Sequence, residues 1–206
     1  MSNSAGYISP VSSSVGTPGT HVPGKSALEN GMLIFVLADM SMFGMFFIVY
    51  CFERSANFAV FQASQLQLNQ TLGMINTLVL LVSSWLVVMA TKAFRHQAPR
   101  AAASCMGLAL LCGFVFIANK FYEYSEKIGD GITLLTNDFF MFYYILTGIH
   151  MLHVIGGMIV LLVFTIKLAG QKWSSLTHAT LEGGAAYWHM VDLLWVVIFP
   201  LIYFLT

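Results

Sequence analysis

The hydrophobic pattern divides the chain into a polar beginning and five long apolar runs. A helix that rises 1.5 Å per residue needs about 20 residues to cross a hydrocarbon core of about 30 Å. Five runs reach that length: Met32 to Phe52, Thr71 to Phe94, Ala101 to Phe121, Phe139 to Ile166 and Ala185 to Leu205. The pattern therefore predicts an all-α integral membrane protein, folded as a bundle of five transmembrane helices.

The first thirty residues differ in character from the rest of the chain. They are rich in Ser, Gly and Pro and contain no apolar run long enough for a signal peptide. Such a composition is typical of flexible segments. We predict a flexible cytoplasmic tail over residues 1–30 and a transmembrane domain over residues 31–206.

The composition supports a membrane location and argues against binding of nucleic acid. The chain is 58% hydrophobic and 9% charged, whereas soluble domains carry roughly 25% charged residues. Its formal net charge is zero, so no basic surface is available to bind nucleic acid. The three cysteines lie in apolar runs without the spacing of a metal site.

The distribution of Lys and Arg predicts the orientation in the membrane. Cytoplasmic flanks of membrane helices carry an excess of these residues. One side holds Lys25, Lys92, Arg95, Arg100, Lys167 and Lys172, and the other holds Arg54, Lys120 and Lys127. The N-terminus is therefore expected in the cytoplasm, and the C-terminus on the periplasmic or extracellular side of a bacterial inner membrane.

Asp39, His150, His153, His189 and Asp192 are ionisable and lie away from the ends of the predicted spans. A charge within the bilayer costs several kcal/mol, so each is expected to face the bundle interior and to have a partner. The histidines at 150 and 153 share one helix face, as do His189 and Asp192. Counting from the predicted helix start puts His189 about 6 Å and Asp192 about 10 Å deep. At that depth the two can share one layer with Asp39 and His153.

Three interpretations of this polar layer compete. Hydrogen bonding that holds helices together is favoured, because His and Asp can satisfy each other where water is absent. A proton relay uses the same residue types. Metal or haem ligation is the weakest interpretation, since no Cys or Glu completes a ligand set. We predict no catalytic, cofactor-binding or metal-ligating residue.

Two further features give structural expectations. Lys120 and Glu123 lie three residues apart at the outer end of the third span, which predicts a local ion pair. The tryptophans Trp85, Trp188 and Trp195 are expected to face lipid or the membrane interface.

Three stretches resemble, in order and spacing, the subunit III family of haem-copper oxidases. They are NKFYEYSEKIGDGI, FFMFYYILTGIHMLHVIGGMIVLLV and AAYWHMVDLLWVVIFPLIYF, with an EY pair, an HxxH helix and a terminal YWHxVDxxW helix. The earlier stretch LIFVLADMSMFGMFF resembles the family's helix with a buried acid, so Asp39 takes the place of its membrane carboxylate. The resemblance covers residues 31–206.

The resemblance implies a non-catalytic subunit of a bacterial respiratory terminal oxidase. Family members bind no redox cofactor, pack beside the catalytic subunit I that holds the haems and copper, and hold phospholipid in their helix grooves. They are thought to stabilise that subunit during turnover and to support proton uptake. These properties are expectations for this chain, which would then serve aerobic electron transport without a catalytic site of its own.

Departures from the family leave alternatives open. The chain has five predicted spans where longer members have seven, and Asp39 stands where many members have Glu. Lys120 stands where oxidase members often have Gln, and together with the segment ERSANFAVFQASQLQLNQTLGMINTLVLLVSSW it resembles a branch associated with nitric-oxide reductases. An accessory subunit of such a reductase is therefore one alternative. A stand-alone proton-coupled transporter is another, although the chain lacks the repeat or broken helices found in many carriers.

Overall fold

The computed structural model describes residues 27–170 and 176–205, and every regular element in these ranges is an α-helix. The helices are α1 (Ala27–Ala56), α2 (Phe58–Gln65), α3 (Gln70–Arg95), α4 (Pro99–Gly129), α5 (Asp138–Ala169) and α6 (His178–Tyr203). Five of them, all except α2, are long and apolar enough to cross a membrane. The prediction of an all-α protein with five spans is confirmed for this part of the chain. Most of the predicted tail lies outside the described residues.

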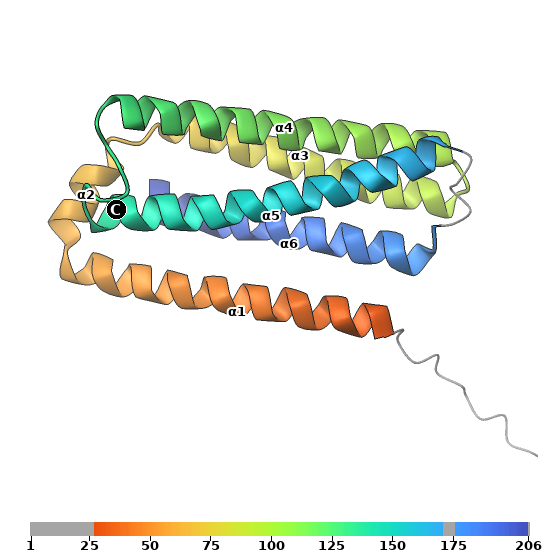
Figure 1. Ribbon diagram of the computed structural model, residues 1–206, viewed down its shortest axis with the longest axis horizontal. Coiled ribbons are helices and arrows are strands. Elements are labelled where there is room, and N and C mark those ends of the chain that lie inside the picture. The colour runs from red at the N-terminus through yellow and green to blue at the C-terminus, as the bar shows by residue number, and fades with distance from the viewer. Residues whose placement is uncertain (1–26, 171–175, 206) are drawn as a thin grey trace, which may run out of the picture.

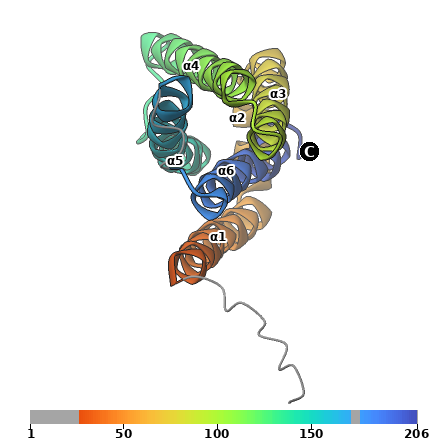
Figure 2. The same ribbon diagram turned by 90° about the vertical axis from the view of Figure 1, so that its right-hand side faces the viewer.

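Four of the long helices form the body of the bundle, and α1 lies outside it. Figures 1 and 2 show α3, α4, α5 and α6 packed around a common core, with α1 against the side formed by α5 and α6. Only 11% of the most apolar window of α1 is buried, against 50% for α6. The helix α1 is therefore held by few contacts, and its polar contacts carry more weight than those of the other helices.

The sequence analysis predicted the five spans alone, and the structure adds the short helix α2 between the first two of them. This short helix lies at one end of the bundle (Figure 1). Its Phe61 is fully buried and meets the rings of Tyr50 and Phe139 edge-on, at centroid distances of 5.4 and 5.7 Å. Burial of an aromatic ring between two other helices stabilises the segment as a helix, and its eight residues are too few to show a clear period in the sequence.

Two helix ends also differ from the sequence prediction. The structure starts α6 at His178, where the Thr177 side chain caps the helix by accepting the backbone N–H of Thr180. It extends α4 to Gly129, because Lys120, Glu123 and Lys127 continue the buried stripe of that helix in place of apolar residues. Hydropathy alone placed both ends too far inside the helices.

Two tryptophans were predicted wrongly. Trp85 is 61% exposed, as expected, but Trp188 and Trp195 are fully buried. Their indole N–H groups donate to the hydroxyls of Ser83 and Thr77 on α3, at 3.1 and 3.0 Å. A buried indole needs such an acceptor, so α3 supplies the polar partners that allow α6 to place both rings in the core.

Close approach of α5 and α6 depends on a glycine, which gives a stability prediction. A Cβ atom at Gly157 would lie 2.5 Å from Cε3 of Trp188, whereas one at Gly148 on the same helix would meet nothing within 4 Å. Gly157→Ala should therefore destabilise the fold by about 1–3 kcal/mol, the usual range for overpacking. Thermal unfolding of the purified protein measures this, with Gly148→Ala as the matched control. Equal unfolding temperatures for the two variants would contradict the packing.

Candidate functional site: buried polar groups of the bundle

The first polar group joins α1 to α5. Oδ1 of Asp39 lies 3.0 Å from Nε2 of His153, and both side chains are largely buried. The other ring nitrogen, Nδ1, lies 2.8 Å from the carbonyl oxygen of Ile149. A carbonyl only accepts, so Nδ1 carries a proton, and one further proton lies between the ring and the carboxyl. The pair is therefore neutral as a whole, whichever partner holds that proton.

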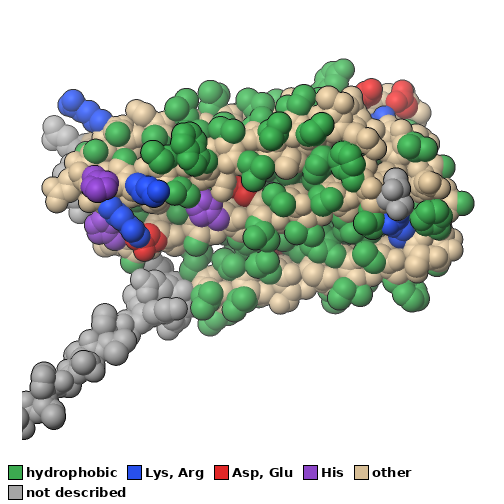
Figure 3. Space-filling view, turned by 180° about the vertical axis from the view of Figure 1, so that it is seen from behind, with side chains coloured by type: hydrophobic (Ala, Val, Ile, Leu, Met, Phe, Trp, Pro, Cys, Tyr) green, Lys and Arg blue, Asp and Glu red, His purple; other side chains and the backbone are tan. Residues whose placement is uncertain are grey.

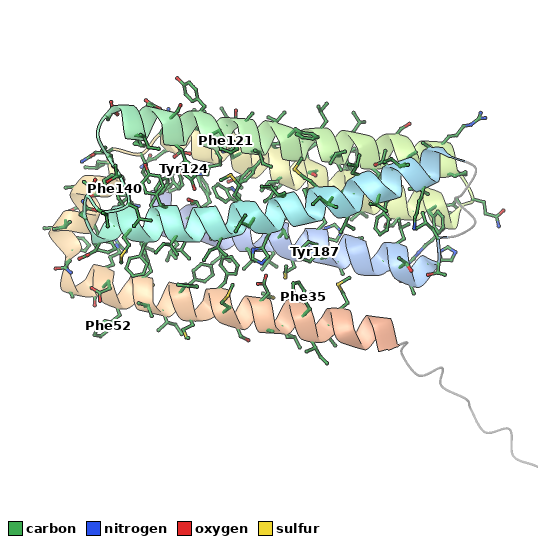
Figure 4. The ribbon with its side chains drawn as sticks, viewed as in Figure 1. Phe35, Phe52, Phe121, Tyr124, Phe140 and Tyr187 are labelled. Atoms are coloured by element: carbon green, nitrogen blue, oxygen red, sulfur yellow. The ribbon has the colours of Figure 1, made fainter. Side chains whose placement is uncertain are left out.

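Aromatic side chains surround this first group. Phe43 meets the His153 ring edge-on at a centroid distance of 5.6 Å. The Tyr187 hydroxyl donates to the backbone oxygen of His153 at 3.3 Å. Tyr187 and Phe35 face each other between α6 and α1, with centroids 6.0 Å apart (Figure 4). The contact between Asp39 and His153 thus lies among apolar side chains, and α1 has a further polar contact where the Tyr50 hydroxyl donates to the backbone oxygen of Leu201 at 3.1 Å.

The second polar group is an ion pair inside the bundle. Nζ of Lys120 donates to Oε2 of Glu123 and to the Tyr203 hydroxyl, both at 2.9 Å, and this hydroxyl donates to Oε1 of Glu123. The Lys120 and Glu123 side chains are 1% and 0% exposed. The sequence predicted a local pair at the helix end, and the structure places it in the core with a third member from α6.

Four aromatic rings enclose the Lys120 ammonium, at 5.0 to 5.8 Å from their centroids: Tyr124, Tyr143, Trp195 and Tyr203. Figure 4 shows Tyr124 pointing from α4 toward α5, where its hydroxyl is hydrogen-bonded to Oγ1 of Thr147. Cation–π attraction is strongest where the cation is desolvated. The cluster therefore joins α4, α5 and α6 by charge, hydrogen bonds and ring contacts together.

The third polar group lies between α3 and α6. Nδ1 of His189 is hydrogen-bonded to the Ser84 hydroxyl at 2.7 Å, and His189 is partly exposed. Asp192 is 4% exposed, and neither carboxyl oxygen has a hydrogen-bond partner among the described residues. The structure therefore does not pair His189 with Asp192. It also puts them deeper than the sequence suggested, roughly 17 and 21 Å from the start of α6 at 1.5 Å per residue.

His150 stands apart from all three groups. Its ring is fully buried between Phe116 and Trp195, at centroid distances of 5.7 and 5.2 Å. Neither ring nitrogen has a partner in the part of the chain that the structure describes. The single layer expected from the sequence is thus divided into separate pairs on different helix contacts.

Asn119 of α4 was not singled out from the sequence, and it is one of several polar contacts between α3 and α4. Asn76 and Asn119 join α3 to α4 through a 2.8 Å hydrogen bond, and the Ser83 hydroxyl donates to the backbone oxygen of Ala109 at 3.0 Å. The polar residues of α3 recur at a spacing of seven, a signal of one helix face. Across the described ranges, no three His, Cys, Asp or Glu side chains gather closely enough to hold a metal ion.

Comparison with known proteins gives consistent matches along the chain. The family described as "Cytochrome c oxidase subunit III" matches residues 6–206. A Synechocystis protein named cytochrome c oxidase subunit 3 is 31% identical, over 85% of this chain and 74% of its own length. A Nocardia farcinica protein named probable cytochrome c oxidase subunit 3 is 27% identical, over 94% of this chain and 99% of its own length. A Staphylococcus saprophyticus protein named probable quinol oxidase subunit 3 is 26% identical, over 84% of this chain and 86% of its own length.

Proposed function

Because the chain belongs to the cytochrome c oxidase subunit III family, we propose that it is the non-catalytic subunit III of a bacterial respiratory terminal oxidase. The family resemblance drawn from the sequence motifs is confirmed by the match over residues 6–206. The catalytic partner, subunit I, supplies the haem and copper that reduce oxygen, and this chain contributes none of these groups. Its contribution is to stabilise that partner during proton-coupled turnover.

The polar groups support a structural role better than a proton relay. Asp39 with His153 and Lys120 with Glu123 each form an overall neutral pair that joins different parts of the bundle. Within residues 27–170 and 176–205, no hydrogen bond links one of these pairs to the other. A relay needs a connected path of hydrogen bonds for the proton. Helix association needs only that each polar group has a hydrogen-bond partner nearby. The pairs therefore hold the subunit in one shape.

A cavity at one end of α1 supports the proposal of a bound phospholipid. It has a volume of about 470 Å³ and lies between α1, α5 and α6. Phe35, Val160 and Phe164 give it apolar walls, and Gly183 and Gly184 line it without side chains of their own. An acyl chain fits such a lining.

The orientation proposed from the sequence also has structural support. The start of α1 and the turn between α3 and α4 lie at one end of the molecule, and α2 and the C-terminus lie at the other (Figure 1). Lys92, Arg95 and Arg100 are exposed at the first end, whereas Arg54 and Lys127 at the opposite end are largely buried. Exposed basic residues favour the cytoplasmic side. We therefore propose that the start of α1 lies on the cytoplasmic side.

The substrate of the whole complex provides the test of this function. Preparations purified through a tag on this chain should consume oxygen when supplied with a reduced donor, cytochrome c or a quinol, in agreement with the names of the relatives. Consumption of nitric oxide without oxygen uptake would instead favour the reductase alternative suggested by Lys120. Neither activity, with the chain purified alone and intact, would favour a transporter.

A further inference from the structure

One face of the bundle has a polar centre where lipid would be expected. Figure 3 looks onto the face formed by α3 and α6, and shows a histidine and an acidic side chain midway along a surface of mainly hydrophobic side chains. The polar residues of this face are Ser84, His189 and Asp192. His189 follows the start of α6 by eleven residues, which puts it near the middle of a 26-residue helix. We call this surface the α3–α6 face.

The hydrogen bonds of this face are incomplete. His189 uses Nδ1 on Ser84, and its second nitrogen, Nε2, has no partner among the described residues. Asp192, one turn further along the same helix, is 4% exposed and lies beneath this surface, so His189 is the side chain that a neighbour can reach. Acyl chains offer no donor or acceptor, and an unsatisfied polar group in hydrocarbon costs several kcal/mol. Lipid is therefore a poor occupant of this face.

The opposite side of the bundle has the character expected for contact with lipid. The groove between α4 and α5 is lined only by apolar side chains, among them Phe114, Ile117 and Ile159. The contrast between the two sides selects the α3–α6 face for contact with protein. A different polypeptide fits better than a second copy of this chain, because the relatives are named as subunits of an oxidase.

We propose that a transmembrane helix of the oxidase's catalytic subunit packs on the α3–α6 face and presents a hydrogen-bonding side chain at the depth of His189. This inference rests on the proposed function and adds to it the surface of assembly. The partner side chain completes the hydrogen bonds of the His189 imidazole, and exposed apolar residues of the same two helices, such as Trp85 and Leu193, supply the packing.

Photo-crosslinking in the membrane tests the position of this surface. A benzophenone amino acid replaces Trp85 on α3, which is 61% exposed, or Leu111 on α4, which is 58% exposed. We expect an adduct with the haem-bearing polypeptide from position 85 and none from position 111. The reverse result, an adduct with a second copy of this chain, or adducts with lipid alone would each overturn the proposal.

A pair of substitutions tests the role of His189. His189→Leu should reduce retention of the haem-bearing polypeptide on the tagged chain roughly tenfold in a stringent detergent wash, as expected for the loss of one or two hydrogen bonds. Ser84→Ala removes only the internal bond and should retain the partner. Equal retention in both variants would overturn the proposal. Failure of the unaltered chain to retain any haem protein would instead contradict the proposed function.

Discussion

Lys120→Met is expected to lower the free energy of unfolding by about 3–5 kcal/mol, the range measured when one partner of a buried ion pair is removed. The substitution keeps a long apolar side chain among the four aromatic rings but leaves Glu123 without its cation. The Tyr203 hydroxyl is then the one remaining donor to that carboxylate among the described residues. Thermal unfolding of the purified complex, followed by circular dichroism, measures the loss.

Two variants serve as controls for this result. Lys127→Met removes another lysine of α4 whose ammonium lies 3.9 Å from the exposed Asp130 carboxylate, and it should cost at most about 1 kcal/mol. The double variant Lys120→Met with Glu123→Leu removes both charges and should recover most of the lost stability. A double variant as unstable as Lys120→Met alone would show that the charges are not the cause.

The second large effect is expected at Asp39, during turnover. Asp39→Asn or His153→Ala should leave the initial rate of oxygen consumption near that of the unaltered complex. The time over which activity persists should fall roughly tenfold in His153→Ala, because the loss of the buried hydrogen bond costs about 1–2 kcal/mol, and by less in Asp39→Asn, whose amide can still donate to Nε2. The physical reason is that few other contacts hold α1 to the bundle. Oxygen uptake followed to inactivation measures both quantities.

The control for this experiment lies on the same helix. Ser41 is exposed, and its hydroxyl bonds the backbone oxygen of Leu37 within α1, so Ser41→Ala should change neither the rate nor the lifetime. Immediate loss of proton pumping in Asp39→Asn, with the complex fully assembled, would favour a proton relay over a structural role. It would contradict the proposed function of this pair.

The membrane spans were predictable because each is a continuous apolar run in the sequence. The elements that were missed depend on contacts between residues far apart in the sequence. The segment that forms α2 is short, and it becomes a helix because Phe61 packs between rings of α1 and α5. The early start of α6 depends on the cap at Thr177. The sequence prediction missed it because Gly183 and Gly184 lower the hydropathy of the first turns. Neither signal is strong in a sequence window of transmembrane length.

The spacing of the candidate polar residues did not predict all of the partners that the structure gives them. A spacing of three residues predicted that Lys120 would reach Glu123, yet the third member, Tyr203, is 80 residues away in sequence. The same spacing put His189 beside Asp192, although the structure pairs His189 with Ser84 on α3. Spacing within a helix fixes which face a residue occupies, and only the packing of helices decides what it meets.

The haem content of the complex tests the central proposal most directly. The chain is purified through a tag in mild detergent, and a reduced-minus-oxidised absorption spectrum is recorded beside a separation of its polypeptides. A subunit III should bring down a larger polypeptide in equal amount, with the spectrum of bound haem. Recovery of this chain alone, as a stable haem-free assembly, would contradict its assignment to an oxidase complex.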